Sequence, residues 1–251
     1  MNVQKRWRYQ GGRIIETEQT HCSHRGPGGK RSERRKPTDA EMVQINERQR
    51  IRKLERLLRA NFTEEDWHLV LTYRKEDRPD PEEAKERLTL FLRKLRKEYR
   101  KAGAELKYIH VTEYLNHAIH HHLVINHIQG DTGMVRRVWE YGRPNFSPLH
   151  EDGDVRGLAE YLVKETVKTR LAPDAVRKQA YTPSRNLIKP EPQEVKTISS
   201  RTYDRPIRIH KGYMLIKDSM EEGVTKYGYP FRRWLEVRID PPEPGGRRKE
   251  Q

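Results

Sequence analysis

The spacing of apolar residues in the middle of the chain changes repeatedly between a strand-like and a helical period. Residues 67–73 have the length and the β-branched and aromatic composition of a buried strand. Residues 106–113 predict a second strand and residues 118–126 a third. A short polar connection separates these two, which favours an antiparallel hairpin. A weaker strand is expected at residues 145–149.

Helical spacing predicts helices before, between and after these strands. Residues 37–61 combine a capping-box start with apolar residues at helical intervals. A long amphipathic helix is expected to start at Pro81 and to be ended by Gly103. Shorter helices are expected to begin at Asp131 and Asp154. The order of strand, helix, strand, strand, helix, strand, helix predicts an α+β domain with helices packed on an antiparallel sheet.

The segments on either side of this region have a different character. Residues 1–36 are basic and contain glycine, so we expect a flexible arm that lies on phosphates. Residues 171–251 begin rich in proline and basic residues, which predicts a linker and a C-terminal extension. Within the extension, residues 212–217 and 234–239 fit two further strands, and roughly the last 12 residues are expected to be disordered.

The composition favours a basic protein that binds nucleic acid. Of the 251 residues, 33% are hydrophobic and 35% are charged, so a core can occupy only part of the chain. The 52 Lys+Arg exceed the 37 Asp+Glu and give a net charge of +15, which suits a polyanion. The single cysteine, Cys22, excludes an internal disulfide framework and fits a reducing cytosol. No apolar run reaches the roughly 18–20 residues that span a bilayer, so no membrane partner is expected.

The helix expected at residues 37–61 carries a basic face in addition to its apolar one. This basic face fits a surface that binds DNA and fits an ordinary solvated helix face equally well. Its candidate DNA contacts are Arg48, Arg52, Lys53 and Arg56.

Three consecutive histidines run directly into the apolar part of the third expected strand. Because side chains alternate between the faces of a strand, His120 and His122 point to one side and His121 to the other. Two imidazoles two residues apart on one face can bind a divalent metal together. Glu113 ends the preceding strand, and its carboxylate could complete a site for Mg²⁺ or Mn²⁺. A strand-end glutamate that faces water is the alternative interpretation.

A tyrosine lies beside the apolar face of the helix expected from Asp154. Tyr161 can pack where helix and sheet meet, and Lys164 lies three residues on along the same flank. A nearby ammonium favours the phenolate form of a tyrosine, whose ordinary pKa is about 10. Taken alone, the pattern fits a boundary tyrosine and a solvated lysine. Beside a divalent metal in a basic protein, the phenol could attack a phosphodiester.

The order and spacing of these motifs resemble the HUH endonucleases, the family of rolling-circle replication initiators, over residues 62–170. The run from His120 to His122 resembles the histidine–hydrophobic–histidine motif of that family, although its middle residue here is a histidine. The segment Tyr161-Leu-Val-Lys164 resembles the family's Tyr-x-x-Lys nucleophile motif. It contains one tyrosine, as in single-tyrosine members.

Two further elements of the resemblance lie on the expected strands. Residues 69–73 are similar to the family's first, strand-borne motif, and we expect Thr72 and Tyr73 to contact DNA. Glu113 stands where some members place a third metal ligand. The flanking sequence also looks like that of replication proteins of bacterial phages and mobile elements.

The resemblance implies a small five-stranded sheet with helices, a divalent metal site and nicking and joining of single-stranded DNA at an origin or hairpin. Tyr161 would attack the DNA and leave a 5′-phosphotyrosine and a free 3′-OH. Lys164 would position or neutralise the nucleophile or the phosphate. A bacterial cytoplasmic location and the host helicase and replication machinery as partners are further implications.

Other functions compete with replication initiation. A conjugative relaxase or a transposase would use the same chemistry. A non-catalytic single-strand-binding module would explain the charge, but such a sheet exposes aromatic residues for base stacking. The expected strands place metal-type ligands instead. A structural DNA-packaging protein explains the charge and leaves the histidines unexplained.

Overall fold

The computed structural model describes residues 1–22, 38–113, 119–149, 155–170, 180–225 and 228–239. The chain forms two compact units. Residues 36–189 make the central unit, and residues 1–35 together with 190–251 make the terminal unit. None of the helices in the described ranges combines the length and the apolarity needed to cross a membrane.

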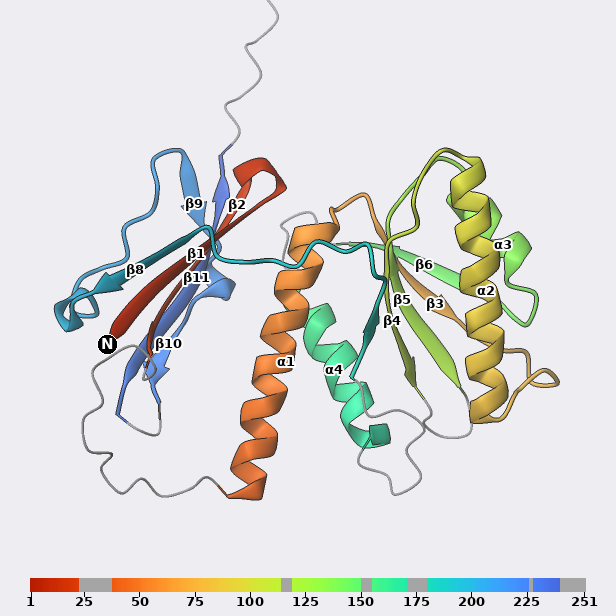
Figure 1. Ribbon diagram of the computed structural model, residues 1–251, viewed down its shortest axis with the longest axis horizontal. Helices are drawn as coiled ribbons and strands as arrows, with labels where there is room; N and C mark the ends of the chain where they lie inside the picture. Colours follow the sequence, from red (N-terminus) through yellow and green to blue (C-terminus); the bar gives the residue numbers. More distant parts are fainter. Residues whose placement is uncertain (23–37, 114–118, 150–154, 171–179, 226–227, 240–251) are drawn as a thin grey trace, which may run out of the picture. The chain divides into compact units, whose positions relative to one another are not determined.

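A five-stranded antiparallel sheet is the centre of the central unit (Figure 1). The strand order is β6–β3–β5–β4–β7, so the strand that begins with the three histidines is the middle one. The segments β3–α2–β4 and β5–α3–β6 are two β-α-β units whose strands interleave. This architecture confirms the α+β class and the antiparallel sheet. The strands are β3 Trp67–Leu71, β4 Tyr108–Glu113, β5 His120–Ile125, β6 Pro144–Pro148 and β7 Thr182–Pro183.

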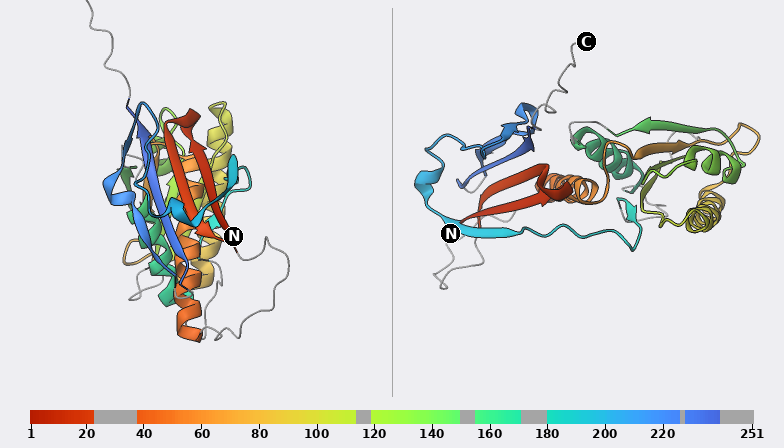
Figure 2. Two further views of the ribbon diagram at one scale, coloured as in Figure 1. Left: turned by 90° about the vertical axis from the view of Figure 1, so that its left-hand side faces the viewer. Right: turned by 90° about the horizontal axis from the view of Figure 1, so that it is seen from above.

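Helices cover both faces of this sheet (Figure 2). On one face α2 and α3 pack in a core that includes Leu69, Leu123 and Trp139. On the other face α1 and α4 pack in a core that includes Val111 and Val124. The helices are α1 Asp39–Asn61, α2 Pro81–Lys101, α3 Asp131–Val138 and α4 Arg156–Arg170. The predicted domain of residues 62–170 lies inside the central unit, which also includes α1 and β7.

The terminal unit joins the first and last described segments in one antiparallel sheet. The strand order is β10–β11–β2–β1–β8, and β9 pairs with β11. The strands are β1 Asn2–Tyr9, β2 Ile14–His21, β8 Glu194–Ile198, β9 Tyr213–Leu215, β10 Glu221–Val224 and β11 Pro230–Arg238. The strands expected at residues 212–217 and 234–239 correspond to β9 and β11.

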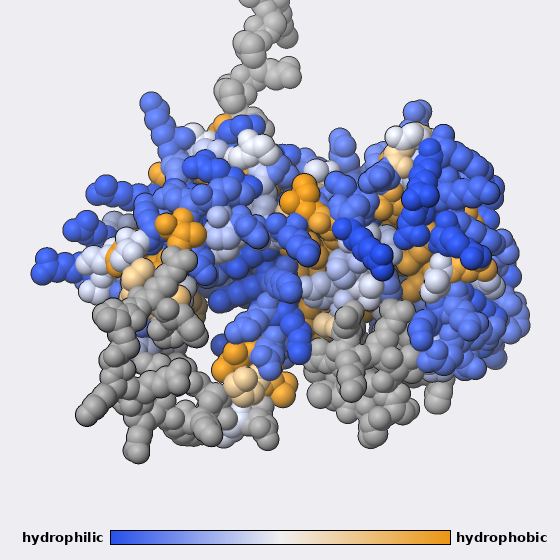
Figure 3. Space-filling model, viewed as in Figure 1, coloured by the Kyte–Doolittle hydropathy of each residue, from blue (hydrophilic) through white to orange (hydrophobic). Residues whose placement is uncertain are grey.

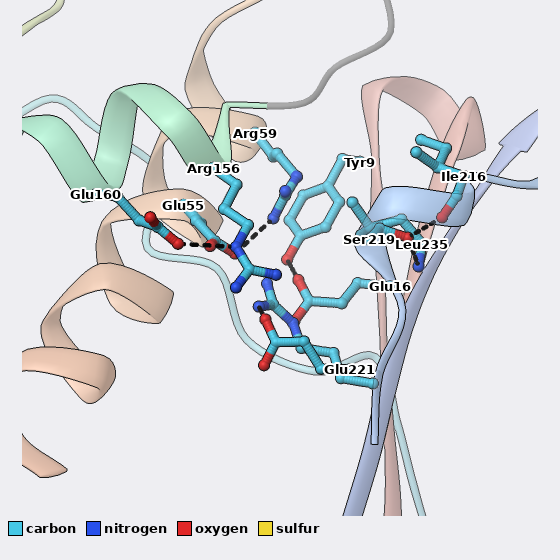
Figure 4. A network of polar contacts seen from close by, with 11 residues as sticks. Tyr9, Glu16, Glu55, Arg59, Arg156, Glu160, Ile216, Ser219, Glu221 and Leu235 are labelled. Atoms are coloured by element: carbon cyan, nitrogen blue, oxygen red, sulfur yellow. Dashed lines mark hydrogen bonds and ion pairs between the residues drawn. The ribbon is translucent and has the colours of Figure 1, made fainter. Parts of the chain in front are cut away.

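The prediction of a flexible basic arm is wrong for residues 2–21, which form the hairpin of β1 and β2. Apolar residues do alternate along β1, but arginines and lysines fill the positions between them and hide the period of two. Their charges are paired inside the sheet, as in the ion pair between Arg6 and Glu194. Figure 4 shows Tyr9 donating a hydrogen bond of 2.9 Å to Glu16. Residues 23–36 of the predicted arm lie outside the described residues.

The prediction of a linker and extension is also wrong for part of residues 190–239. Strand β8 pairs with β1, and β11 pairs with β2, so segments about two hundred positions apart in sequence share one sheet. A composition-based interpretation cannot detect such pairing, because each strand is short and its partner is distant. Residues 240–251, predicted to be disordered, lie outside the described residues.

Gly142 lets the loop after α3 approach the end of β3 in the central unit. A Cβ atom at this position would lie 2.0 Å from the carbonyl oxygen of Thr72 and 2.9 Å from the Cα atom of Tyr73. The Thr72 hydroxyl donates a hydrogen bond of 2.9 Å to the carbonyl oxygen of Arg143, and Trp139 donates one of 3.0 Å to the carbonyl oxygen of Thr72. The loop is therefore held at a distance that only glycine permits.

Replacing Gly142 with alanine should lower the free energy of unfolding by about 1–3 kcal/mol, because backbone atoms must move to admit the methyl group. Gly133→Ala is the matched control, since nothing lies within 4 Å of its added Cβ. Alanine inside α3 should raise the free energy of unfolding by about 0.5–1 kcal/mol. Urea denaturation measures both effects. Equal stability of the two variants would contradict the packing argument.

Candidate active site

Strand β5 presents its first and third histidines on the face of the sheet that α4 covers. His122 lies opposite Val111 of β4, and His120 lies opposite Glu113. Residues directly opposite in an antiparallel pair share a face, so His120, His122 and Glu113 lie on one side of the sheet. Val111 belongs to the core that α4 helps to form, which identifies this side as the α4 face.

His122 is the centre of the polar contacts on this face. Its Nε2 atom lies 3.2 Å from Oε2 of Glu113 and 3.4 Å from the hydroxyl oxygen of Tyr161. Its Nδ1 atom lies 3.4 Å from Nε2 of His68 on β3. The structure therefore brings together a histidine, a carboxylate and a tyrosine that are separated by up to 48 positions in sequence, as counted from Glu113 to Tyr161.

Helix α4 positions Tyr161 over the sheet. Ala159, Leu162 and Val163 are buried in the core beneath the helix and fix its orientation. Tyr161 itself is 40% exposed, and its ring lies edge-on to the ring of His122 with centroids 5.3 Å apart. A tyrosine in this place can contact His122 and still meet a substrate from solution.

Lys164 lies on the exposed side of α4. Its ammonium is 3.5 Å from the carboxylate of Glu160, which also accepts a hydrogen bond of 2.9 Å from Arg156. The bond from Arg156, visible in Figure 4, is the main cause that lowers the pKa of Glu160. The structure thus pairs Lys164 with a carboxylate on its own helix, and its contact with a nucleophile or phosphate stays a prediction.

His121 points to the opposite face of the sheet and is fully buried there. Its Nε2 atom lies 2.7 Å from the hydroxyl oxygen of Tyr73, and its Nδ1 atom lies 2.9 Å from the hydroxyl oxygen of Thr112. A buried imidazole is tolerated when both ring nitrogens are hydrogen-bonded. These two hydroxyls therefore explain how a histidine can replace the hydrophobic middle residue of the motif.

The two strand-borne DNA contacts predicted from the sequence have partners inside the protein. Tyr73 packs on the α2–α3 side of the sheet, where its ring meets Trp139 and its hydroxyl meets His121. The hydroxyl of Thr72 donates to the carbonyl oxygen of Arg143. The geometry gives both side chains a structural role, and their contact with DNA stays a prediction.

The four predicted basic contacts lie on α1. Arg48 and Lys53 are exposed, whereas Arg52 and Arg56 are partly buried. At 100° per residue, Arg52 and Arg56 lie opposite Leu54, which is in the core. Figure 3 shows a mostly hydrophilic surface on the viewed face, in line with the high fraction of charged residues. DNA binding by this face of α1 stays a prediction.

His68 is the member of the site that sequence reasoning missed. It lies opposite Val124 of β5, on the same face as His122, and their rings stack with centroids 5.6 Å apart. Burial first, and the neighbouring His122 second, lower the pKa of His68 to about 4, so its ring is neutral near pH 7. The signal was a histidine within the strand of residues 67–73, but its meaning depends on the pairing of β3 with β5.

The donor set on the α4 face is chemically suited to a divalent metal. Two imidazoles and a carboxylate suit Mn²⁺, and oxygen donors suit Mg²⁺. The 3.2 Å between Nε2 of His122 and Oε2 of Glu113 compares with roughly 3 Å between neighbouring ligands of an octahedral ion at 2.0–2.1 Å. Within the described ranges, no three His, Cys, Asp or Glu side chains lie close enough together to hold a metal ion. His120, which would be the third ligand, shares the face without joining such a group.

The sequence of the central unit is similar to a family of replication proteins. Residues 66–170 match the family model described as Replication-associated protein ORF2. No curated protein matches the chain. No solved structure matches it either. The matched residues run from just before β3 to the end of α4, so the part of the chain that carries Tyr161, His122, Glu113 and His68 is similar to replication-associated proteins.

Proposed function

We propose that this protein is a divalent-metal-dependent endonuclease and strand transferase that nicks and rejoins single-stranded DNA to initiate rolling-circle replication of a phage, plasmid or mobile element. The observation that carries the proposal is the 3.4 Å contact between the hydroxyl of Tyr161 and Nε2 of His122. A catalytic tyrosine has to lie beside the group that activates or receives its phosphate. The match of residues 66–170 to replication-associated proteins supports the biological process.

In the proposed reaction, Tyr161 is the nucleophile. Its hydroxyl loses a proton, its oxygen forms a bond to the scissile phosphorus, and the bond from phosphorus to the 3′ oxygen breaks. The 3′ oxygen takes up a proton from water, which leaves a 3′-OH and a 5′-phosphotyrosine. Because the phosphotyrosine keeps the bond energy of the phosphodiester, attack by a 3′-OH reverses the step and joins strands.

The residues around Tyr161 have separate tasks in this proposal. His120, His122 and Glu113 would hold the divalent metal, which supplies Lewis-acid polarisation of the scissile phosphate. His68 keeps the ring of His122 oriented through the contact between Nε2 of His68 and Nδ1 of His122. Since Tyr161 is partly exposed, a single strand can approach it without opening of the fold.

The test is a search for the covalent intermediate. The protein is incubated with Mn²⁺ and single-stranded DNA from its own element, labelled at one end or the other. A 5′-phosphotyrosine keeps the 3′-labelled fragment on the protein and releases the 5′-labelled fragment with a 3′-OH. Transfer of the 5′ label to the protein would contradict the proposed polarity. Binding without any adduct would favour a non-catalytic single-strand-binding module.

A further inference from the structure

Three arginines line an open pocket at β6, the edge strand of the central sheet (Figure 1). The pocket has a volume of about 580 Å³, and its lining includes Arg74, Arg136 and Arg143 with Asn145 and Phe146. Guanidinium groups bind phosphates with several donors at once. A pocket with three of them and one aromatic ring has the composition of a site for single-stranded nucleic acid.

The backbone that carries two of these arginines is held in place by the protein. The N–H of Arg74 donates a hydrogen bond of 2.9 Å to the carbonyl oxygen of Tyr141. The carbonyl oxygen of Arg143 accepts the hydroxyl of Thr72, and Gly142 permits the close approach of the two segments. Arg74 and Arg143 therefore start from fixed points on opposite sides of the pocket, which reduces the entropy lost on binding.

The side chains of the pocket are accessible to a ligand. Arg136 and Arg143 are exposed. Arg74 forms an ion pair of 3.1 Å with Asp77, but the Arg74 side chain is 57% exposed, and a surface pair of this kind is weak enough to be exchanged for a phosphate. Phe146 is partly exposed, and the guanidinium of Arg136 lies 5.8 Å from the centre of its ring.

The pocket and the candidate active site lie at the same end of the sheet. One row of paired residues runs across four strands from Asn145 through Val70 and His122 to Val111. Residues of one row share a face, so Asn145 of the pocket lies on the same side of the sheet as His122. With strands about 4.8 Å apart, β6 and β5 are separated by roughly 10 Å. That distance corresponds to roughly two or three nucleotides at 3.4 Å or more for each.

We propose that this pocket binds the backbone of the single-stranded DNA that leads to Tyr161, two or three nucleotides from the scissile phosphate. Arg74, Arg136 and Arg143 contact phosphates, and Phe146 stacks on an unpaired base. The proposal rests on the proposed function, since it assigns the pocket to the same DNA strand. It adds a binding site that the histidine and tyrosine motifs do not include.

The test measures the affinity for a short oligothymidine at several salt concentrations, with Tyr161→Phe present throughout to prevent cleavage. The triple variant Arg74→Gln, Arg136→Gln, Arg143→Gln should lower the slope of log K against log[salt] by about 2, because each phosphate contact on a single strand contributes about 0.7. At 0.1 M salt the same three contacts amount to roughly a hundredfold in affinity. Fluorescence anisotropy provides both values.

The control variant removes the same charge elsewhere on the central unit: Arg93→Gln, Arg100→Gln, Arg137→Gln. These three arginines are exposed on α2 and α3 and do not line the pocket. The control should lose much less affinity than the pocket variant. If both triple variants lose the same affinity and the same salt slope, the pocket is overturned as a site, and only the general charge of the protein matters.

A second variant tests the stacking part of the proposal. Phe146→Leu should weaken oligothymidine binding by roughly tenfold without a change in salt slope, because a base stacked on an aromatic ring contributes no counterion release. Binding of a duplex of equal length should not change. Equal weakening for duplex and single strand would overturn the stacking contact. Adduct formation by the pocket variant at saturating DNA separates this outcome from a failure of the proposed function, which would abolish the adduct in the unchanged protein as well.

Discussion

Replacing Tyr161 with phenylalanine should abolish the covalent protein–DNA adduct and lower the rate of strand cleavage on the order of 10⁴-fold or more. The phenyl ring retains the edge-on contact with His122, and only the hydroxyl 3.4 Å from Nε2 is lost. Because Tyr161 is 40% exposed, the free energy of unfolding should change by no more than about 0.5 kcal/mol. Denaturing gel electrophoresis of labelled DNA measures the adduct, and urea denaturation confirms the fold.

Tyr141→Phe is the matched control for this experiment. Tyr141 lies close to the motifs in sequence, but its ring packs on Trp139 and under the guanidinium of Arg87, on the α2–α3 side of the sheet. Loss of its hydroxyl should leave adduct formation unchanged. An adduct formed by Tyr161→Phe at the rate of the unchanged protein would show that another residue is the nucleophile.

Features set by neighbouring residues were predictable from the sequence. Helix α2 begins after Asp80, whose side chain accepts the N–H of Glu83, and Pro81 occupies its first turn. Strand β5 follows from three histidines and three apolar residues with the β-strand period. In each case the local hydrogen-bonding and burial requirements agree with the tertiary structure, so a short window of sequence contains enough information.

Features set by pairing between distant segments were not predictable. Strands β1 and β2 look like a basic arm because their charges are compensated by residues such as Glu194, which follows almost two hundred positions later. His68 looked like an ordinary strand residue because its contact with His122 exists only after β3 pairs with β5. A sequence window records the charge or the ring, but the partner that gives each its role is supplied by the fold.

The proposed metal ligands provide the second large effect. Replacing His122 with alanine should lower the cleavage rate on the order of 10²–10³-fold, the loss expected when a principal electrostatic stabiliser of the transition state is removed. His120→Ala should do the same, because the two rings share the face that Glu113 completes. Single-stranded DNA binding should persist in both variants, since it depends on basic side chains rather than on these rings. Mn²⁺ titration, followed by isothermal calorimetry without DNA, should show weakened metal binding.

His121→Ala separates a ligand role from a packing role within the same run of histidines. His121 is fully buried on the other face, and its loss leaves the hydroxyls of Tyr73 and Thr112 without their partner and creates a cavity. We therefore expect the free energy of unfolding to fall by about 2–4 kcal/mol, whereas the folded fraction keeps its Mn²⁺ affinity and its cleavage rate. Three adjacent residues of one type should thus give two opposite phenotypes. If His121→Ala lost metal affinity as His122→Ala does, the alternation of the strand would not determine the site, and the assignment of His120 and His122 as ligands would fail.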